Sequence, residues 1–226
     1  MSDGSGEGSS TAERSHDGQR SDSPADSTDS GDTSLDRLGL DIRIGLAAHR
    51  PYAIVALGIF LCSMPAGWLL QSVGIGRGDL LLPWTGNAMY AQDLPLGVIL
   101  GADTELFSLL VVGALTGGVL TVVGLASQGL YVGFFLGSSA SELGAGYLVV
   151  SVVPHALPRA LGFALAAAVS FRLVACGGAW MLGRRERVQF PREWRQAGLL
   201  LALSWLLVAL SGLIEALLTF RLLTLL

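Results

Sequence analysis

Apolar residues run along this chain in long blocks, separated by short polar stretches or stretches rich in glycine and proline. Most blocks approach the 20 or so residues that an α-helix needs to cross the hydrocarbon core of a bilayer. The pattern predicts an all-α, polytopic membrane helical bundle of about five transmembrane helices. Their expected boundaries are residues 52–72, 105–126, 128–143, 159–182 and 196–219.

Three segments between these blocks behave differently. Leu35 to Arg50 has apolar residues near helical spacing with charges between them, which predicts an amphipathic lead-in at the membrane surface. Residues 74–104 contain several Gly, Pro and Asn turn signals, and their apolar runs are too short to span. They are expected to form an extracytoplasmic interfacial loop, and one short re-entrant element is the alternative. Residues 144–157 are apolar but contain Pro154, with Pro158 just beyond, which predicts a half-helix.

Residues 1–34 differ sharply from the rest in composition. They contain eight acidic residues and two arginines, and they lack Leu, Ile, Val and aromatic residues. Such a segment cannot bury enough apolar surface to offset its chain entropy, so a disordered acidic tail is expected. It has neither a basic start nor an apolar core, unlike a secretory signal. All 14 basic residues are arginine, and together with the acidic tail this suggests, as a hypothesis, a halophilic archaeal source.

Arginine positions predict the orientation of the protein in the cell membrane. Arg37, Arg43 and Arg50 precede the first span, and residues 183–195 form an arginine-rich loop between the fourth and fifth spans. Positive charge collects on the cytoplasmic side of membrane proteins. With five spans, both groups lie in the cytoplasm, so the N-terminus is expected to be cytoplasmic and residues 74–104 extracytoplasmic.

A run of small residues in the third block predicts close helix packing. Gly129, Gly133 and Gly137 recur every fourth residue. This spacing places three residues without side chains on one face of a helix, where a second backbone can approach. It does not identify the partner helix.

Ionisable residues inside the apolar blocks are the candidate functional residues, because charged groups are costly in lipid and usually face the protein interior or water. We expect Glu215 to pair with Arg172 or Arg159, giving a neutral cluster inside the bundle. One interpretation is structural, with ion pairs that fix helix register, and the other is a site for an ion, a proton or a polar ligand. The candidate cluster comprises Glu142, His155, Arg159, Arg172 and Glu215.

Motifs for enzymatic chemistry are lacking in the sequence. It has no Gly-x-Ser-x-Gly or His-Glu-x-x-His, and its three histidines are too few for a histidine-rich metal centre. No catalytic residue, metal ligand or cofactor site is therefore expected, and the protein is predicted not to be an enzyme. Its arginines beside the membrane favour anionic lipid over nucleic acid as a partner. The sequence leaves membrane or cytoplasmic protein partners and a homo-oligomer open.

Four short motifs between Glu105 and Thr219 resemble the stage II sporulation protein M family of integral membrane proteins. The family's Asn-Gly with a glycine four residues on is similar to Gln128-Gly129 and Gly133, and its Gly-Leu-Arg-Leu element resembles 170–173. Its Pro-His-Gly-x-x-Glu element resembles 154–159, with Ala156 for Gly and Arg159 for Glu. Its Ile-Glu-Ala-x-x-Thr-Pro signature, the most specific of the four, resembles Ile214 to Phe220, with Phe for Pro.

The resemblance implies a non-enzymatic helical membrane protein that acts as a scaffold or as a component of an assembly. The exchange of a family glutamate for Arg159 reverses the local charge, which marks this chain as a divergent member. The alternative function is a small channel or secondary transporter with its site at the broken segment 144–159, since interrupted helices form the binding sites of many transporters.

Overall fold

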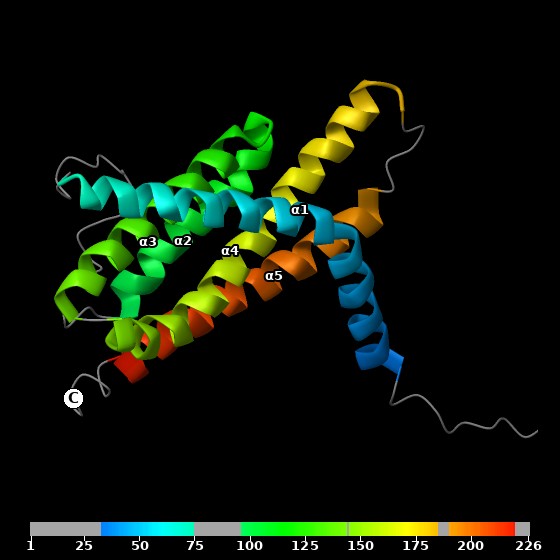
Figure 1. The fold of residues 1–226 in the computed structure, drawn as a ribbon. Coiled ribbons are helices and arrows are strands. Elements are labelled where there is room, and N and C mark those ends of the chain that lie inside the picture. Colours follow the sequence, from blue (N-terminus) through cyan, green and yellow to red (C-terminus); the bar gives the residue numbers. More distant parts are fainter. Residues whose placement is uncertain (1–32, 75–95, 144, 185–189, 220–226) are drawn as a thin grey trace, which may run out of the picture.

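The computed structural model describes residues 33–74, 96–143, 145–184 and 190–219, although the side chains of 33–37, 141–151, 190–192 and 218–219 are not described. Its described residues form helices and turns without a strand (Figure 1). The helices are α1 (Thr33–Ser72), α2 (Leu96–Val112), α3 (Val119–Leu143), α4 (Ala145–Met181) and α5 (Phe190–Ile214), with a 3₁₀ turn η3 (Gly113–Thr116) and a π-helical turn η4 (Glu215–Thr219).

Five helices in the described part of the chain are long and apolar enough to cross a membrane. This confirms the predicted all-α membrane bundle. The spanning stretches are Leu38–Ser72, Leu96–Thr116, Val119–Ala140, Val152–Met181 and Glu193–Leu217. The predicted disordered tail lies outside the described residues, except for the last two residues of its range, which begin α1.

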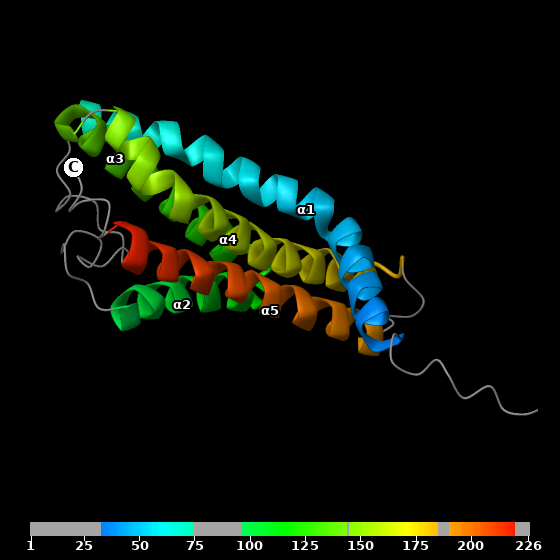
Figure 2. The same ribbon diagram turned by 90° about the horizontal axis from the view of Figure 1, so that it is seen from below.

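Helix α1 joins the predicted lead-in and the first span into one element that contains Pro51 and Pro65. Its N-terminal part turns away from the rest of the helix (Figures 1 and 2). Pro51 has no N–H to donate to the carbonyl four residues earlier, so a change of direction at this point is expected. An ion pair between Asp41 and Arg195 ties the lead-in to α5.

Helices α2 and α3 form a hairpin whose boundaries differ from the prediction. The sequence places the second span at 105–126, but α2 begins at Leu96, and the chain turns at η3 before α3 begins at Val119. Residues 96–104 are therefore helical and not part of an interfacial loop, and 75–95 lie outside the described residues. Gly117 and Gly118 have φ values of 65° and 88°, a left-handed conformation that suits glycine and closes the turn.

A backbone carbonyl near the end of α2 accepts hydrogen bonds from hydroxyl groups of two other helices. The Leu110 carbonyl lies just before the α-helical pattern gives way to η3. It accepts hydrogen bonds from Thr121 Oγ1 of α3 at 3.0 Å and from Ser170 Oγ of α4 at 2.5 Å. In lipid a backbone carbonyl needs a protein partner, so these bonds fix the hairpin against α4.

Helix α4 corrects the prediction of a half-helix at 144–157. It runs without interruption from Ala145 to Met181 and contains both Pro154 and Pro158. Prolines are tolerated in membrane helices when neighbouring groups satisfy the carbonyls nearby. Ser211 Oγ of α5 donates to the His155 carbonyl at 2.6 Å within this proline-containing stretch. The interrupted helix on which the transporter alternative depended is therefore absent from the described chain.

Helix α5 begins six residues earlier than predicted, so the end of the expected arginine-rich loop is helical. Residues 185–189 of that loop lie outside the described residues. Along its length α5 packs against α4 (Figure 2). Ser204 Oγ donates to the Gly162 carbonyl at 2.6 Å, and a Cβ at Gly162 would lie 2.7 Å from Val208 Cγ2. Glycine at 162 thus sets the close spacing of these two helices.

The three packing glycines of α3 face α1. A Cβ at Gly129 would collide with the Phe60 carbonyl, and one at Gly133 would collide with the Met64 carbonyl. A Cβ at Gly67 of α1 would collide with the Leu130 carbonyl in the same way. A Cβ at Gly137 would lie 3.2 Å from the Gln71 side chain. Small residues on both helices therefore bring two backbones together, as in other tightly packed membrane helix pairs.

Replacing Gly133 by alanine should separate α1 from α3, because the new methyl group would overlap the Met64 backbone. Overpacking of this kind costs about 1–3 kcal/mol. Gly198→Ala is the matched control, since a Cβ at Gly198 meets nothing within 4 Å. Thermal unfolding of both variants in one mild detergent measures the difference. Equal midpoints for the two variants would contradict the close approach.

Candidate functional site

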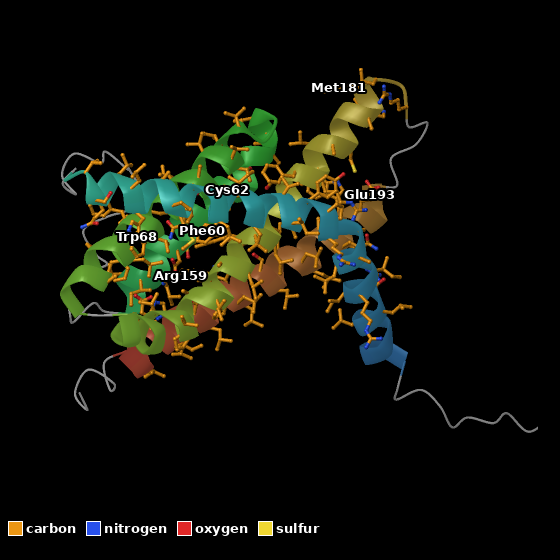
Figure 3. All side chains as sticks on the ribbon, viewed as in Figure 1. Phe60, Cys62, Trp68, Arg159, Met181 and Glu193 are labelled. Carbon is orange, nitrogen blue, oxygen red and sulfur yellow. The ribbon has the colours of Figure 1, made fainter. Side chains whose placement is uncertain are left out.

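Three charged side chains from three helices meet inside the bundle. Arg159 of α4 lies between Asp103 of α2 and Glu215, which begins η4 after α5. Arg159 Nη2 is 2.9 Å from Asp103 Oδ2 and 2.6 Å from Glu215 Oε2. The side chains of Arg159, Asp103 and Glu215 are only 7%, 11% and 18% exposed. Figure 3 shows Arg159 within the bundle. We call these three residues the charge cluster.

The charge cluster is compact because a single nitrogen serves both acids. Nη2 of a guanidinium carries two hydrogens, so it can donate one to each carboxylate. With all three groups ionised the charge cluster has a formal charge of −1. The Nε atom of Arg159 is buried and has no hydrogen-bond partner among the described residues. The two bonds from Nη2 to the carboxylates are charge-assisted and therefore short and strong. They join α2, α4 and the end of α5.

Local packing brings the three helices close enough for the charge cluster to form. A Cβ at Gly212 would lie 3.1 Å from Leu100 Cδ2, so the glycine allows α2 to approach α5 one turn before Glu215. Asp103 follows Leu100 by three residues and therefore lies on the same side of α2. The bond from Ser211 to the His155 carbonyl holds α5 against α4 at the same level.

Beside the charge cluster, a crevice of about 350 Å³ lies between α1, α3 and α4. Its lining is mainly apolar, with Gln128, Tyr131, His155 and Arg159 as the polar side chains. His155 and Arg159 are four residues apart, and both line the crevice, as expected for one helix face. The exposed residues Leu61, Val153 and Leu157 also line it, so it opens towards the lipid-facing surface.

Arg172 lies apart from the charge cluster and contacts α1. Its Nη1 is 3.0 Å from His49 Nδ1, and that ring nitrogen is also 2.7 Å from the Gly45 carbonyl. The nitrogen can accept from Arg172 only without a proton, and it can donate to Gly45 only with one. His49 is 3% exposed, so this contact connects α1 and α4 inside the protein.

The structure thus separates the predicted polar residues. It brings Arg159 and Glu215 together, places His155 beside them on the crevice, and joins Arg172 to His49. Glu142 lies in α3, but its side chain is outside the described residues. No group of three His, Cys, Asp or Glu residues in the described part of the chain is placed to bind a metal ion.

Sequence reasoning missed Asp103 and His49. The turn signals of 74–95 predict a loop that extends to Thr104, and this range includes Asp103. The residues from Leu96 to Thr116 contain only two acids in an otherwise apolar stretch, and that pattern could have identified a span. His49 precedes Pro51, where the sequence pattern changes from amphipathic to apolar, and nothing in it indicates a contact 123 residues away.

Comparison with known proteins agrees with this architecture. The sequence model of the family described as Stage II sporulation protein M matches residues 56–220, which is more than half of the chain. The chain belongs to that family. No curated protein and no solved structure gives a significant match. The match begins within α1 and includes all three residues of the charge cluster.

Arg159→Gln should destabilise the protein strongly, because it leaves two buried carboxylates without a cation. Removing one partner from a buried ion pair costs about 3–5 kcal/mol. Asp103→Asn should cost less, because Arg159 keeps Glu215 as its partner. The triple variant with Arg159→Gln, Asp103→Asn and Glu215→Gln should recover part of the loss, since it has no unpaired charge. Unfolding midpoints in mild detergent give the order of stability of these variants. A triple variant that is no more stable than Arg159→Gln would contradict the pairing of these charges.

Proposed function

We propose that this member of the stage II sporulation protein M family is a non-enzymatic scaffold or assembly component of the cell membrane. In this proposal, the protein holds membrane or cytoplasmic protein partners through its lipid-facing helices and its arginine-rich segment. It needs no cofactor, and its partners do not include nucleic acid. The N-terminus and the segment between α4 and α5 lie in the cytoplasm.

The observation that carries the proposal is the use of polar groups within the bundle. Arg159 and its two acids join three helices, and Arg172 joins α4 to α1. Four hydroxyl groups also bond to backbone carbonyls of other helices, namely those of Thr121, Ser170, Ser204 and Ser211. Such contacts fix helix positions. The described crevice opens sideways and is lined mainly by apolar side chains, which suits contact with another membrane component better than passage of a polar solute.

The arginines and the turns support the proposed orientation. The exposed Arg43 and Arg50 precede the apolar part of α1, and the exposed Arg184 follows α4. The lead-in and the start of α5 are joined by the Asp41–Arg195 ion pair, so these positions share one end of the bundle. Positive charge at that end favours the cytoplasm.

Cysteine labelling tests the orientation. In a variant with Cys62 and Cys176 replaced by alanine, Arg184→Cys should resist a membrane-impermeant thiol reagent in intact cells and react after the membrane is opened. Gly74→Cys, at the other end of α1, should react in intact cells. The reverse labelling pattern would show that the N-terminus is outside.

Photo-crosslinking in cells tests the scaffold. A photoreactive residue at the exposed Trp205 of α5 or at Arg184 should give discrete adducts with another protein. The matched control is Leu125, which is 2% exposed and should give no intermolecular adduct. The scaffold proposal would be contradicted if the photoreactive residues gave adducts with lipid alone and the purified protein carried solute flux in vesicles. That result would favour a transporter.

A further inference from the structure

The outward face of α2 carries polar and very small residues where lipid-facing apolar side chains would be expected. A Cβ at Gly97 or at Gly101 would meet nothing within 4 Å, so this surface is open. Three more exposed residues of α2 follow Gly101 by three, four and seven residues, and Gly97 precedes it by four. All of them therefore lie on the same face of the helix as Gly101. We call this surface the α2 face, and its exposed members are Gly97, Gly101, Thr104, Glu105 and Ser108.

Glu105 lies near the middle of its membrane span. The span runs from Leu96 to Thr116. At about 1.5 Å per residue, Glu105 is about 14 Å from its first residue and about 16 Å from its last. It is therefore close to the centre of the hydrocarbon core, where acidic residues almost always face protein or water. An outward carboxylate at this depth requires something other than lipid to cover it.

Rotation of α2 cannot hide Glu105. Two residues before it, Asp103 points to the opposite side of the helix and bonds to Arg159. Leu106 and Leu110 are also buried on the inner side, at 4% and 0% exposure. Turning Glu105 inward would turn Asp103 outward and break the charge cluster. Helix α2 also lies at the edge of the bundle, with its outer side uncovered (Figure 2).

The α2 face carries both a hydrogen-bond donor and a hydrogen-bond acceptor. Glu105 offers an acceptor and Ser108 a donor, and neither has a polar partner in the described part of the chain. Thr104 is already used, since its Oγ1 donates to the Leu100 carbonyl at 2.6 Å. A surface with a donor and an acceptor one turn apart is self-complementary about a two-fold axis.

We propose that a second copy of this chain covers the α2 face, so that the protein is a symmetric dimer with two α2 helices packed side by side. Ser108 of each copy donates to Glu105 of the other, and Gly101 allows the two backbones to approach. This inference goes beyond the scaffold function, because a monomer could hold partners equally well. A lipid cannot bond the carboxylate at this depth, and a different protein partner is one outcome of the test.

A larger side chain at position 101 tests the dimer without disturbing the packing inside the monomer, because a Cβ there meets nothing within 4 Å. Gly101→Ile should raise the apparent dissociation constant in mild detergent by at least about tenfold, the equivalent of about 1.4 kcal/mol. Gly198→Ile is the control, because Gly198 of α5 is equally open within the monomer. Glu105→Leu should also weaken the dimer, and Glu105→Gln should retain it because its amide oxygen still accepts from Ser108. Mass photometry or light scattering gives the oligomeric state.

Disulfide trapping in native membranes gives an independent result. With Cys62 and Cys176 replaced by alanine, Gly101→Cys should form a covalent dimer of this chain on oxidation. Leu206→Cys, on the exposed face of α5, should not. A wild-type protein that is monomeric in mild detergent would overturn the proposal. So would equal effects of the two isoleucine variants, or a Gly101→Cys adduct with a different protein. None of these outcomes bears on photo-crosslinking from Arg184.

Discussion

A buried guanidinium that needs two carboxylates organises this protein. Arg159 could not remain in the interior of a membrane bundle alone, and its two acids come from helices that are distant in sequence. The cost of leaving any one of these charges unpaired is comparable to a large part of a protein's net stability. The positions of α2, α4 and the end of α5 are therefore coupled through one side chain. The remaining hydroxyl-to-carbonyl bonds refine an arrangement that this contact requires.

The two polar regions of the bundle carry opposite charge. The charge cluster has one more acid than base, whereas Arg172 contacts a histidine and has no acidic partner among the described residues. Arg172 follows Phe171, whose ring would lie 3.4 Å from a Cβ at Gly118 in the α2–α3 turn. Arg172 is thus near the end of the bundle that carries Arg184. If that end is cytoplasmic, the membrane potential favours this separation of charge.

The number of helices and the close-packing glycines could be predicted because they depend on local patterns. Long apolar blocks fix the spans, and a glycine at every fourth position gives a helix face without side chains. The boundaries were less well predicted where turn signals and helix overlap. The turn signals place Asp103 in a loop, whereas the structure places it in α2. Pro154 and Pro158 predict a half-helix, whereas α4 continues through both prolines. The pairing of Arg172 with His49 depends on tertiary packing, which no short pattern records.

The spacing of the charge cluster along the chain has a consequence for biogenesis. Asp103 and Arg159 are 56 residues apart, and Arg159 and Glu215 are separated by the same distance. Because synthesis proceeds from the N-terminus, α2 leaves the ribosome with its acid long before the arginine that neutralises it. The insertion machinery must therefore shelter this helix, or retain it near water, until α4 arrives. Only the last helix completes the set, so a ribosome that stops before Glu215 releases a chain whose arginine has one of its two acids.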